Sequence, residues 1–370
     1  MTSIRILTVR VAALGAMAAA AAGAQGIGGL LPTADSPPPT RSGTRGANWL
    51  HIPIGARGQA LGGAIGSSVL GSMAWFWNPA GAATIESFDL ALGRQNLYGD
   101  LGIQQTYMAV SFPMLGGAIG LAINSLNSGD IPLSSEDAPY GQPTLGDFFT
   151  WSSTAASAGY ARRLTDRLDV GGSVKMVSEG ITQIRNHFIA ADVGMQFRTG
   201  LFGLVLGGSL LSVGSSAHMD GVGLERGANT NDVSRAQTRF KLYTLPVDLP
   251  TEFRFSAGDD LLGSAESLFG RGSGRHTLSA EIDVNDAVDA ASQLGIGVEY
   301  GFRNTIFARG GKRFYNDSRK PAGASAAYGF SGGFGLRIPL AGHPLRFDYS
   351  YVSLGDLKDI QVFSLEFGGR

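Results

Sequence analysis

The feature that most constrains this chain is a two-residue alternation of apolar and polar side chains, which recurs over most of its length. Successive side chains of a β-strand point to opposite faces, so this pattern predicts strands with one apolar and one polar face. In residues 276–284 the apolar face carries Leu278, Ala280, Ile282 and Val284. The polar face of the same stretch carries Thr277, Ser279, Glu281 and Asp283.

About fourteen such segments follow one another along the chain. Most are close to the 9–11 residues that a tilted strand needs to cross a bilayer, whereas strands of soluble proteins average about 5–6 residues. The predicted strands are 87–96, 104–112, 118–126, 151–162, 168–178, 188–199, 203–213, 251–257, 276–284, 292–301, 304–313, 327–338, 345–353 and 360–368.

The connections between these segments alternate in length, independently of the strand pattern. Short ones such as PMLGG, LTDR and TGL are followed by long ones at 127–150, 214–250 and 314–326. Outer-membrane barrels have short periplasmic turns and long external loops. One connection, DDLLGSAESLFGRGSGR, should be short but is long enough for a helical turn or two. With an even strand count, both ends of the barrel sequence are expected on the periplasmic side.

Composition supports a closed sheet. Beyond residue 24 no apolar run approaches the roughly 18 residues of a transmembrane helix, so a spanning structure has to be a barrel. Glycine is abundant, with 55 of 370 residues, about twice the average usage of about 7%. The chain has no cysteine, so disulfides cannot stabilise it and a complete hydrogen-bond ladder would have to.

The N-terminus has the form of an export signal. Arg5 and Arg10 precede an alanine-rich apolar run that ends in Ala22-Gly23-Ala24, and cleavage is predicted after Ala24. A Pro-rich leader follows at 25–44. Without the signal, 27 basic residues stand against 30 acidic ones, a balance that gives no indication of nucleic-acid binding.

The polar faces of the predicted strands carry charges of both signs. In a soluble sandwich they would face water, whereas in a membrane barrel they line the lumen. Strand length, strand number and loop asymmetry all favour the barrel. The charged side chains are therefore expected to pair across a polar lumen. They are Glu281, Asp283, Glu299, Arg303, Arg337, Arg346, Asp348 and Glu366.

The segment before the first strand, residues 45–85, is rich in glycine and contains MAWFWNPAGA. Its aromatic side chains require burial, and the barrel interior is the nearest surface. Asn-Pro starts turns, and proline disfavours helix at the residue before it. A compact, loop-like hatch is predicted, entering from the periplasmic mouth. Its central element is Trp75, Phe76, Trp77, Asn78, Pro79, Ala80 and Gly81.

This segment, GARGQALGGAIGSSVLGSMAWFWNPAGAATI, resembles the N-terminal signature of the PorV/PorQ family, whose members are relatives of the FadL fatty-acid transporter. The resemblance continues through YMAVSFPMLGGAIGLAINSLNSGDIP and LPVDLPTEFRFSAG to the final strands. It implies an all-β, 14-stranded antiparallel outer-membrane barrel at 86–370 with an N-terminal hatch. It also implies a role in type IX secretion, in which PorV receives cargo proteins by their C-terminal signal domain.

Two functions remain open at this point, besides the possibility of a plugged barrel with only a scaffolding role. The first is a type IX secretion component whose loops 127–150 and 214–250 bind secreted cargo or secretion machinery. The second, also implied by the resemblance, is a FadL-like channel for hydrophobic small molecules such as fatty acids. The expected surroundings are outer-membrane lipid in both cases. The five histidines are scattered singly and no G-x-S-x-G occurs, so no catalytic residue, metal or cofactor is predicted.

Overall fold

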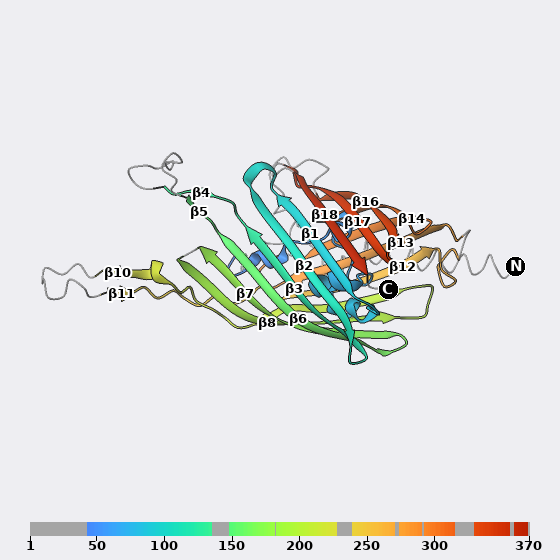
Figure 1. Ribbon diagram of the computed structural model, residues 1–370, viewed down its shortest axis with the longest axis horizontal. Coiled ribbons are helices and arrows are strands. Elements are labelled where there is room, and N and C mark those ends of the chain that lie inside the picture. The colour runs from blue at the N-terminus through green and yellow to red at the C-terminus, as the bar shows by residue number, and fades with distance from the viewer. Residues whose placement is uncertain are drawn as a thin grey trace, which may run out of the picture.

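The computed structural model describes residues 43–134, 148–181, 183–227, 239–270, 274–290, 292–314, 329–355 and 359–368. The predicted signal and most of the leader lie outside these ranges. The chain forms a closed barrel of 14 antiparallel strands (Figure 1), which confirms the predicted fold class. Pairing of the first and last strands, from Asp89↔Gly368 to Asn96↔Gln361, closes it.

The barrel strands overlap all fourteen predicted segments and several are longer. The reason is that the hydrogen-bond ladder continues past the apolar band into polar residues. The strands are β1 (Asp89–Leu97), β2 (Ile103–Met114), β3 (Gly117–Asn127), β6 (Ser152–Thr165), β7 (Leu168–Ile181), β8 (Ile184–Arg198), β9 (Val205–Gly214), β12 (Glu252–Leu262), β13 (His276–Ala287), β14 (Gln293–Phe302), β15 (Ile306–Phe314), β16 (Phe330–Leu340), β17 (His343–Ser353) and β18 (Asp359–Gly368).

The two ends of the barrel differ, as the connection lengths predicted. At one end, here called the turn end, β1 begins, β18 ends and most connections are tight turns. At the other, the loop end, two small hairpin sheets extend the wall: β4 (Ile131–Pro132) with β5 (Phe148–Phe149), and β10 (Glu225–Gly227) with β11 (Arg239–Lys241). The connection between β12 and β13 is long enough for a helical turn or two, and its described residues, 263–270 and 274–275, contain no helix.

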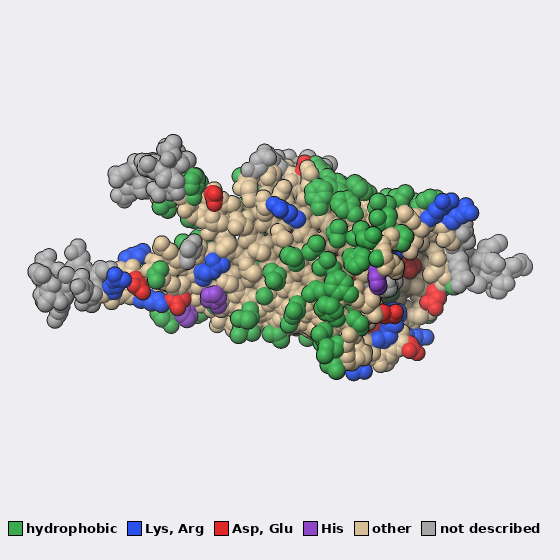
Figure 2. Space-filling model, viewed as in Figure 1, with side chains coloured by type: hydrophobic (Ala, Val, Ile, Leu, Met, Phe, Trp, Pro, Cys, Tyr) green, Lys and Arg blue, Asp and Glu red, His purple; other side chains and the backbone are tan. Residues whose placement is uncertain are grey.

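The outer and inner faces of the wall separate apolar from polar side chains. Outward residues such as Val298 and Phe347 are about 40% exposed, whereas inward Ser350 and Asp348 are fully buried. Figure 2 shows hydrophobic side chains spread over the barrel wall, with charged ones gathered mainly toward the two ends. This distribution suits a wall that faces lipid outside and a polar interior. Within the described residues, no helix is long and apolar enough to cross a membrane.

The N-terminal segment, residues 43–85, occupies the interior of this barrel (Figure 1, blue). It was expected to be loop-like, but it folds into five short helical pieces. They are η2 (Asn48–His51), α2 (Ala56–Ala60), η3 (Gly71–Met73), α3 (Ala74–Trp77) and η4 (Pro79–Thr84). The Asn78 side chain accepts a hydrogen bond from the Ala80 amide and so caps η4, which begins at Pro79.

The segment does not start at the turn end, where the sequence had placed its entry. Residues 46 and 47 instead bond to the loop end, where the Gly46 amide donates to the Asp248 carbonyl at 2.9 Å. The chain then runs through the barrel to the start of β1 at the turn end. The physical reason is apolar burial, because Trp49 and Leu50 are accommodated among inward-facing side chains at the loop end.

Glycines on the inner wall allow the segment to pack against it closely. An ideal Cβ on Gly311 of β15 would lie 2.3 Å from the backbone nitrogen of Gly62, and one on Gly297 of β14 would lie 2.6 Å from the Leu61 carbonyl oxygen. The outward neighbour Gly310 has nothing within 4 Å of the same position. Much of the unusual glycine content therefore has a packing function.

Candidate functional site

An apolar cluster closes the lumen at the loop end. Trp49 and Leu50 of the N-terminal segment are 7% and 8% exposed, and they pack with Phe188, Val177 and other inward residues. The members on barrel strands come from β17, β18, β1, β3, β6, β7 and β8, which belong to one continuous part of the wall. The remaining buried members are Ala47, Ala56, Leu97, Leu126, Ala155, Ala190, Ala217, Leu249, Val352, Ile360 and Val362. We call this group the loop-end cluster.

Polar contacts fasten the same part of the segment to the wall. The Ala47 amide donates to Glu179 Oε1 at 2.8 Å, and Arg45 forms an ion pair with Asp248. Both contacts lie beside the loop-end cluster, of which Ala47 is a member.

His51 forms a second polar fastening. Its Nδ1 lies 3.0 Å from Glu252 Oε2 and its Nε2 lies 3.2 Å from Asp289 Oδ1. Burial by itself lowers the pKa of His51, but the hydrogen bonds and charges of Asp289 and Glu252 outweigh it and raise that pKa to about 9. His51 is therefore positively charged at neutral pH.

The aromatic element lies in the middle of the lumen. Trp75 and Trp77 are 4% and 2% exposed. Trp75 Nε1 donates to Ser111 Oγ at 2.9 Å, and Trp77 Nε1 donates to the Ile54 carbonyl at 3.2 Å. The Arg254 guanidinium lies 4.9 Å from the centre of the Trp77 ring, within the range of a cation–π contact.

Beyond the tryptophans, the Asn-Pro-Ala-Gly element is tied to the wall through its asparagine. Asn78 Nδ2 donates to the carbonyls of Gly66, at 2.9 Å, and Met195, at 3.0 Å. Pro79, Ala80 and Gly81 are buried, and η4 packs against β6, β7 and β8. The space left around Trp75 and Phe76 is a cavity of about 40 Å³. The middle of the lumen is therefore filled by protein.

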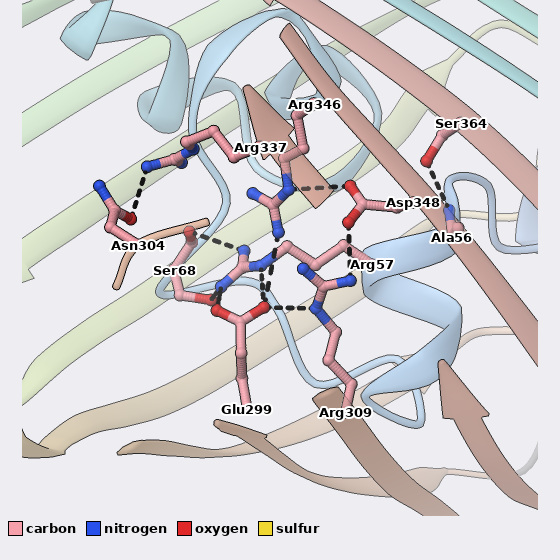
Figure 3. Close-up of polar contacts among 10 residues, drawn as sticks. All are labelled: Ala56, Arg57, Ser68, Glu299, Asn304, Arg309, Arg337, Arg346, Asp348 and Ser364. Atoms are coloured by element: carbon pink, nitrogen blue, oxygen red, sulfur yellow. Dashed lines mark hydrogen bonds and ion pairs between the residues drawn. The ribbon is translucent and has the colours of Figure 1, made fainter. Parts of the chain in front are cut away.

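A buried ion-pair network joins the segment to the wall nearer the turn end (Figure 3). Arg57 of α2 donates from Nε to Glu299 Oε2 at 3.1 Å and from Nη2 to Oε1 at 3.3 Å. Glu299 also pairs with Arg309, which donates to Asp348 Oδ1 at 2.7 Å. Arg346 pairs with Asp348 at 2.9 Å and completes the network.

Arg57 is the only Lys, Arg, Asp or Glu between residues 46 and 85. Burial opposes its charge, but Glu299 outweighs burial and raises the pKa of Arg57 above its ordinary value. The segment thus has three cationic side chains, Arg45, His51 and Arg57, and each meets one or more carboxylates of the barrel.

Between this network and the turn end lie two adjoining hollows, of about 610 Å³ and 330 Å³. Both are bordered by Arg57, Ser68, Asp260 and Glu299. The lining is largely polar, unlike the loop-end cluster. We call these hollows together the turn-end chamber.

The structure brings most of the predicted lumen residues together. Glu299, Arg346 and Asp348 belong to the network described above. Glu281 accepts hydrogen bonds from the Ser67 amide at 2.7 Å and from its hydroxyl at 2.6 Å. The remaining inward positions are Asp283 beside Gly66, and Arg337 and Glu366 in the chamber wall. Their functional importance stays a prediction.

Arg303 is an exception to the predicted lumen set. It lies exposed in the turn after β14, with a positive φ of 52°, and not in the lumen. The alternation continued one residue beyond the end of the strand, and the tight turn reversed the chain there.

Sequence reasoning missed the residues that fasten the segment. They are His51, Arg57, Glu252, Asp289 and Arg309. One signal was present, since an isolated arginine in an otherwise uncharged and buried segment requires a buried carboxylate partner. Nothing local in the sequence identified which carboxylate it would be.

The fold and the filled lumen define a class of protein, the 14-stranded outer-membrane β-barrel whose interior is occupied by its own N-terminal segment. No protein-family model and no curated protein matches the chain. The predicted PorV/PorQ assignment is thus not confirmed by any family match.

The chain is similar to several solved barrels. The toluene transporter TbuX of Ralstonia pickettii matches with a TM-score of 0.50 and 13% identity, over 85% of this chain and 96% of that one. The monoaromatic hydrocarbon channel CymD matches at 0.48 and 10%, over 85% and 96%. The toluene transporter TodX of Pseudomonas putida matches at 0.48 and 11%, over 84% and 95%. The similarity to TbuX supports the fold.

Proposed function

We propose that this protein is an outer-membrane channel for hydrophobic small molecules, with the N-terminal segment as a movable plug. The observation that carries the proposal is the loop-end cluster, in which Trp49 and Leu50 close the lumen with apolar surface. An apolar closure disfavours the passage of water and polar solutes. An apolar molecule arriving from outside can replace these side chains with little change in buried apolar area.

The next surface along such a route is aromatic. Leu50 borders the central cavity together with Trp75, Phe76 and Tyr107. The cavity of about 40 Å³ is too small for a toluene-sized molecule, so passage requires the segment to shift. The toluene transporter TbuX has a similar barrel fold, and this agrees with an apolar substrate.

The test is uptake by intact cells of a Gram-negative host that lacks its own hydrophobic-substrate channels. We expect cells that express this protein to accumulate radiolabelled toluene and oleate faster than vector controls. Trp49→Ala, which removes the central closing side chain, should accelerate uptake further. If the folded protein leaves uptake of both probes at the vector level, the channel function is wrong.

A second candidate is the secretion-associated, cargo-binding role of the PorV/PorQ type. The observation in its favour is a group of exposed apolar side chains around the β10–β11 hairpin, where Tyr243 is 84%, Leu245 87% and Phe240 51% exposed. Such a projecting surface suits a protein partner. The type IX role itself rests on the sequence resemblance.

One purification separates the two candidates. The tagged protein is isolated from its native outer membrane in mild detergent, and proteins and extracted lipids are both analysed by mass spectrometry. Stoichiometric secreted proteins with a common C-terminal domain would favour the cargo-binding role. Their absence, with a bound hydrophobic small molecule, would favour the channel.

A further inference from the structure

The central cavity beside Trp75 and Phe76 is bordered by a buried hydrogen-bond donor that has no acceptor. Asn124 of β3 borders this cavity and is 5% exposed. Its Oδ1 accepts a hydrogen bond from Gln105 Nε2 at 3.1 Å. Its Nδ2 has no hydrogen-bond partner among the described residues. A buried donor in this state is costly, so the site favours a group that can accept from it.

A row of buried side-chain amides fixes the orientation of Asn124. The Pro53 carbonyl, which can only accept, receives hydrogen bonds from Gln59 Nε2 at 2.7 Å and Gln95 Nε2 at 2.8 Å. Gln95 Nε2 also donates to Gln105 Oε1 at 2.6 Å, so Gln105 presents its own Nε2 to Asn124 Oδ1. Each amide sets the direction of the next, and Asn124 Nδ2 is the donor left at the end of the row.

Arg254 of β12 supplies a second donor at the same cavity. It is 4% exposed, and its Nε donates to Glu252. Within the described ranges, Arg254 Nη1 has no hydrogen-bond partner. Asn124 and Arg254 belong to the barrel wall, whereas the N-terminal segment contributes Leu50, Trp75 and Phe76 to the border. The two donors therefore stay at the lumen when that segment shifts.

The charged side chains that border the cavity are balanced. Lys175 lies 2.8 Å from Asp192, and Arg254 forms an ion pair with Glu252. Each cation at the border thus has its own carboxylate there.

The charges just outside the border do not add a positive excess. His51 meets Glu252 and also Asp289, and Asp283 borders the adjoining hollow together with Arg254. Around the cavity the carboxylates are at least as numerous as the cations. An anionic ligand would gain no net attraction here, so the two donors suit a neutral acceptor oxygen.

We propose that the substrate carries a neutral acceptor oxygen on an apolar body, as an aromatic ketone does, and that Asn124 Nδ2 and Arg254 Nη1 donate to this oxygen. The inference rests on the proposed channel function and narrows its substrate class. The apolar body takes the place of Leu50 and Phe76 beside the aromatic wall. A plain hydrocarbon leaves both donors unpaired and is the weaker ligand.

The test compares para-fluoroacetophenone with para-fluoroethylbenzene, which have the same shape and differ in a carbonyl against a methylene. Fluorine NMR measures binding of each probe to the purified full chain in detergent micelles, relative to partition of that probe into protein-free micelles. The ketone should bind at least about fivefold more strongly on this scale, as expected from the net contribution of one hydrogen bond. The carbonyl stretching frequency of the bound ketone should also fall, because hydrogen bonding weakens the carbonyl bond.

Asn124→Asp is the sharpest variant, because it keeps an acceptor for Gln105 and replaces the free donor by an oxygen. Binding of the ketone should fall about fivefold, and binding of para-fluoroethylbenzene should not change. The matched control is Asn96→Asp on the exposed outer face of β1, which makes the same chemical change away from the cavity. Both probes should bind this variant as they bind the wild type.

Equal relative binding of the two probes by the wild type, or no binding of the ketone, overturns the proposal without any variant. Equal binding is the result expected of a cavity that only holds water. An equal loss of ketone binding in Asn124→Asp and Asn96→Asp also overturns it. Cellular uptake is a separate readout. Toluene uptake with equal probe binding removes this inference and leaves the channel, whereas ketone preference without any uptake removes the channel and leaves the binding site.

Discussion

The two ends of the lumen hold the same N-terminal segment by opposite physical means. At the loop end, Trp49 and Leu50 are buried among apolar side chains, with Arg45 and His51 as the adjacent charged contacts. At the turn end, Arg57 is held by Glu299 in a network beside a polar chamber of about 610 Å³. One end is closed and apolar, whereas the other is hollow and charged.

The difference indicates a division of roles. A guanidinium stays charged at every physiological pH, so the buried Arg57 contact does not depend on pH, and neither does the more exposed Arg45–Asp248 pair at the loop end. The His51 contact at the loop end does depend on protonation. The loop-end closure also relies on hydrophobic burial, which an apolar ligand can replace. We therefore expect the segment to be anchored toward the turn end and to move at the loop end.

The largest effect should come from breaking the charged anchor. Glu299→Gln leaves Arg57, Arg309 and Arg346 without their common carboxylate. Removing one partner of a buried ion pair costs about 3–5 kcal/mol, so the free energy of unfolding should fall by about that amount. The measurement is urea unfolding of the protein in lipid vesicles.

Its control is an exposed ion pair at the loop end. Glu225 lies 3.4 Å from Arg239, and both side chains are well exposed. Glu225→Gln should change the free energy of unfolding by less than about 1 kcal/mol. Comparable losses in the two variants would contradict a special role for the Glu299 network.

An intermediate effect should follow from deprotonating His51. Because its pKa is raised from 6.5 to about 9, its stabilisation is complete below about pH 6.5 and is lost as the pH rises through about 9. The full loss is on the order of 3 kcal/mol, at 1.36 kcal/mol per pKa unit. Raising the pH should therefore loosen the loop end and leave the turn end in place.

Cysteine labelling can check this end by end, because the chain has no cysteine of its own. Ala47→Cys reports on the loop end and Ser68→Cys on the turn-end chamber. Rates are normalised to the unfolded protein at each pH, since the thiol itself titrates. Only the Ala47→Cys rate should rise between pH 6.5 and 9, and His51→Gln should abolish that rise. A parallel rise at both positions would remove the distinction between the ends.

The smallest effect should come from filling the glycine-lined wall between the two ends. Gly311→Ala places a methyl group 2.3 Å from Gly62 N, which forces the segment away from β15. Overpacking of this kind costs about 1–3 kcal/mol. Gly310→Ala, one residue away on the outer face, meets nothing within 4 Å and should leave the unfolding midpoint unchanged. Equal shifts in the two variants would show that the close packing of the segment against Gly311 of β15 does not contribute to stability.

The barrel itself could be predicted because the sequence signals for it, alternation and connection length, are local. Alternation in stretches such as 276–284 reports which side chains face lipid, and loop lengths report which end each connection occupies. The strand ends were less certain, because β12 continues to Leu262 through Asp259 and Asp260 with no apolar signal. Arg303 was misplaced for a related reason, since a turn with positive φ interrupts the alternation at that residue.

The sequence by itself determined the strand number, the inward or outward parity of the side chains, the asymmetry of the two ends and the need to bury the aromatic element. Only the tertiary structure decided that the N-terminal segment starts at the loop end and that Arg57 meets Glu299, 242 residues away. The physical reason is that the direction of a side chain, inward or outward, follows from its position within its own strand. The facing of side chains across a lumen depends on how fourteen strands close and stagger around the segment, which no single stretch of sequence specifies.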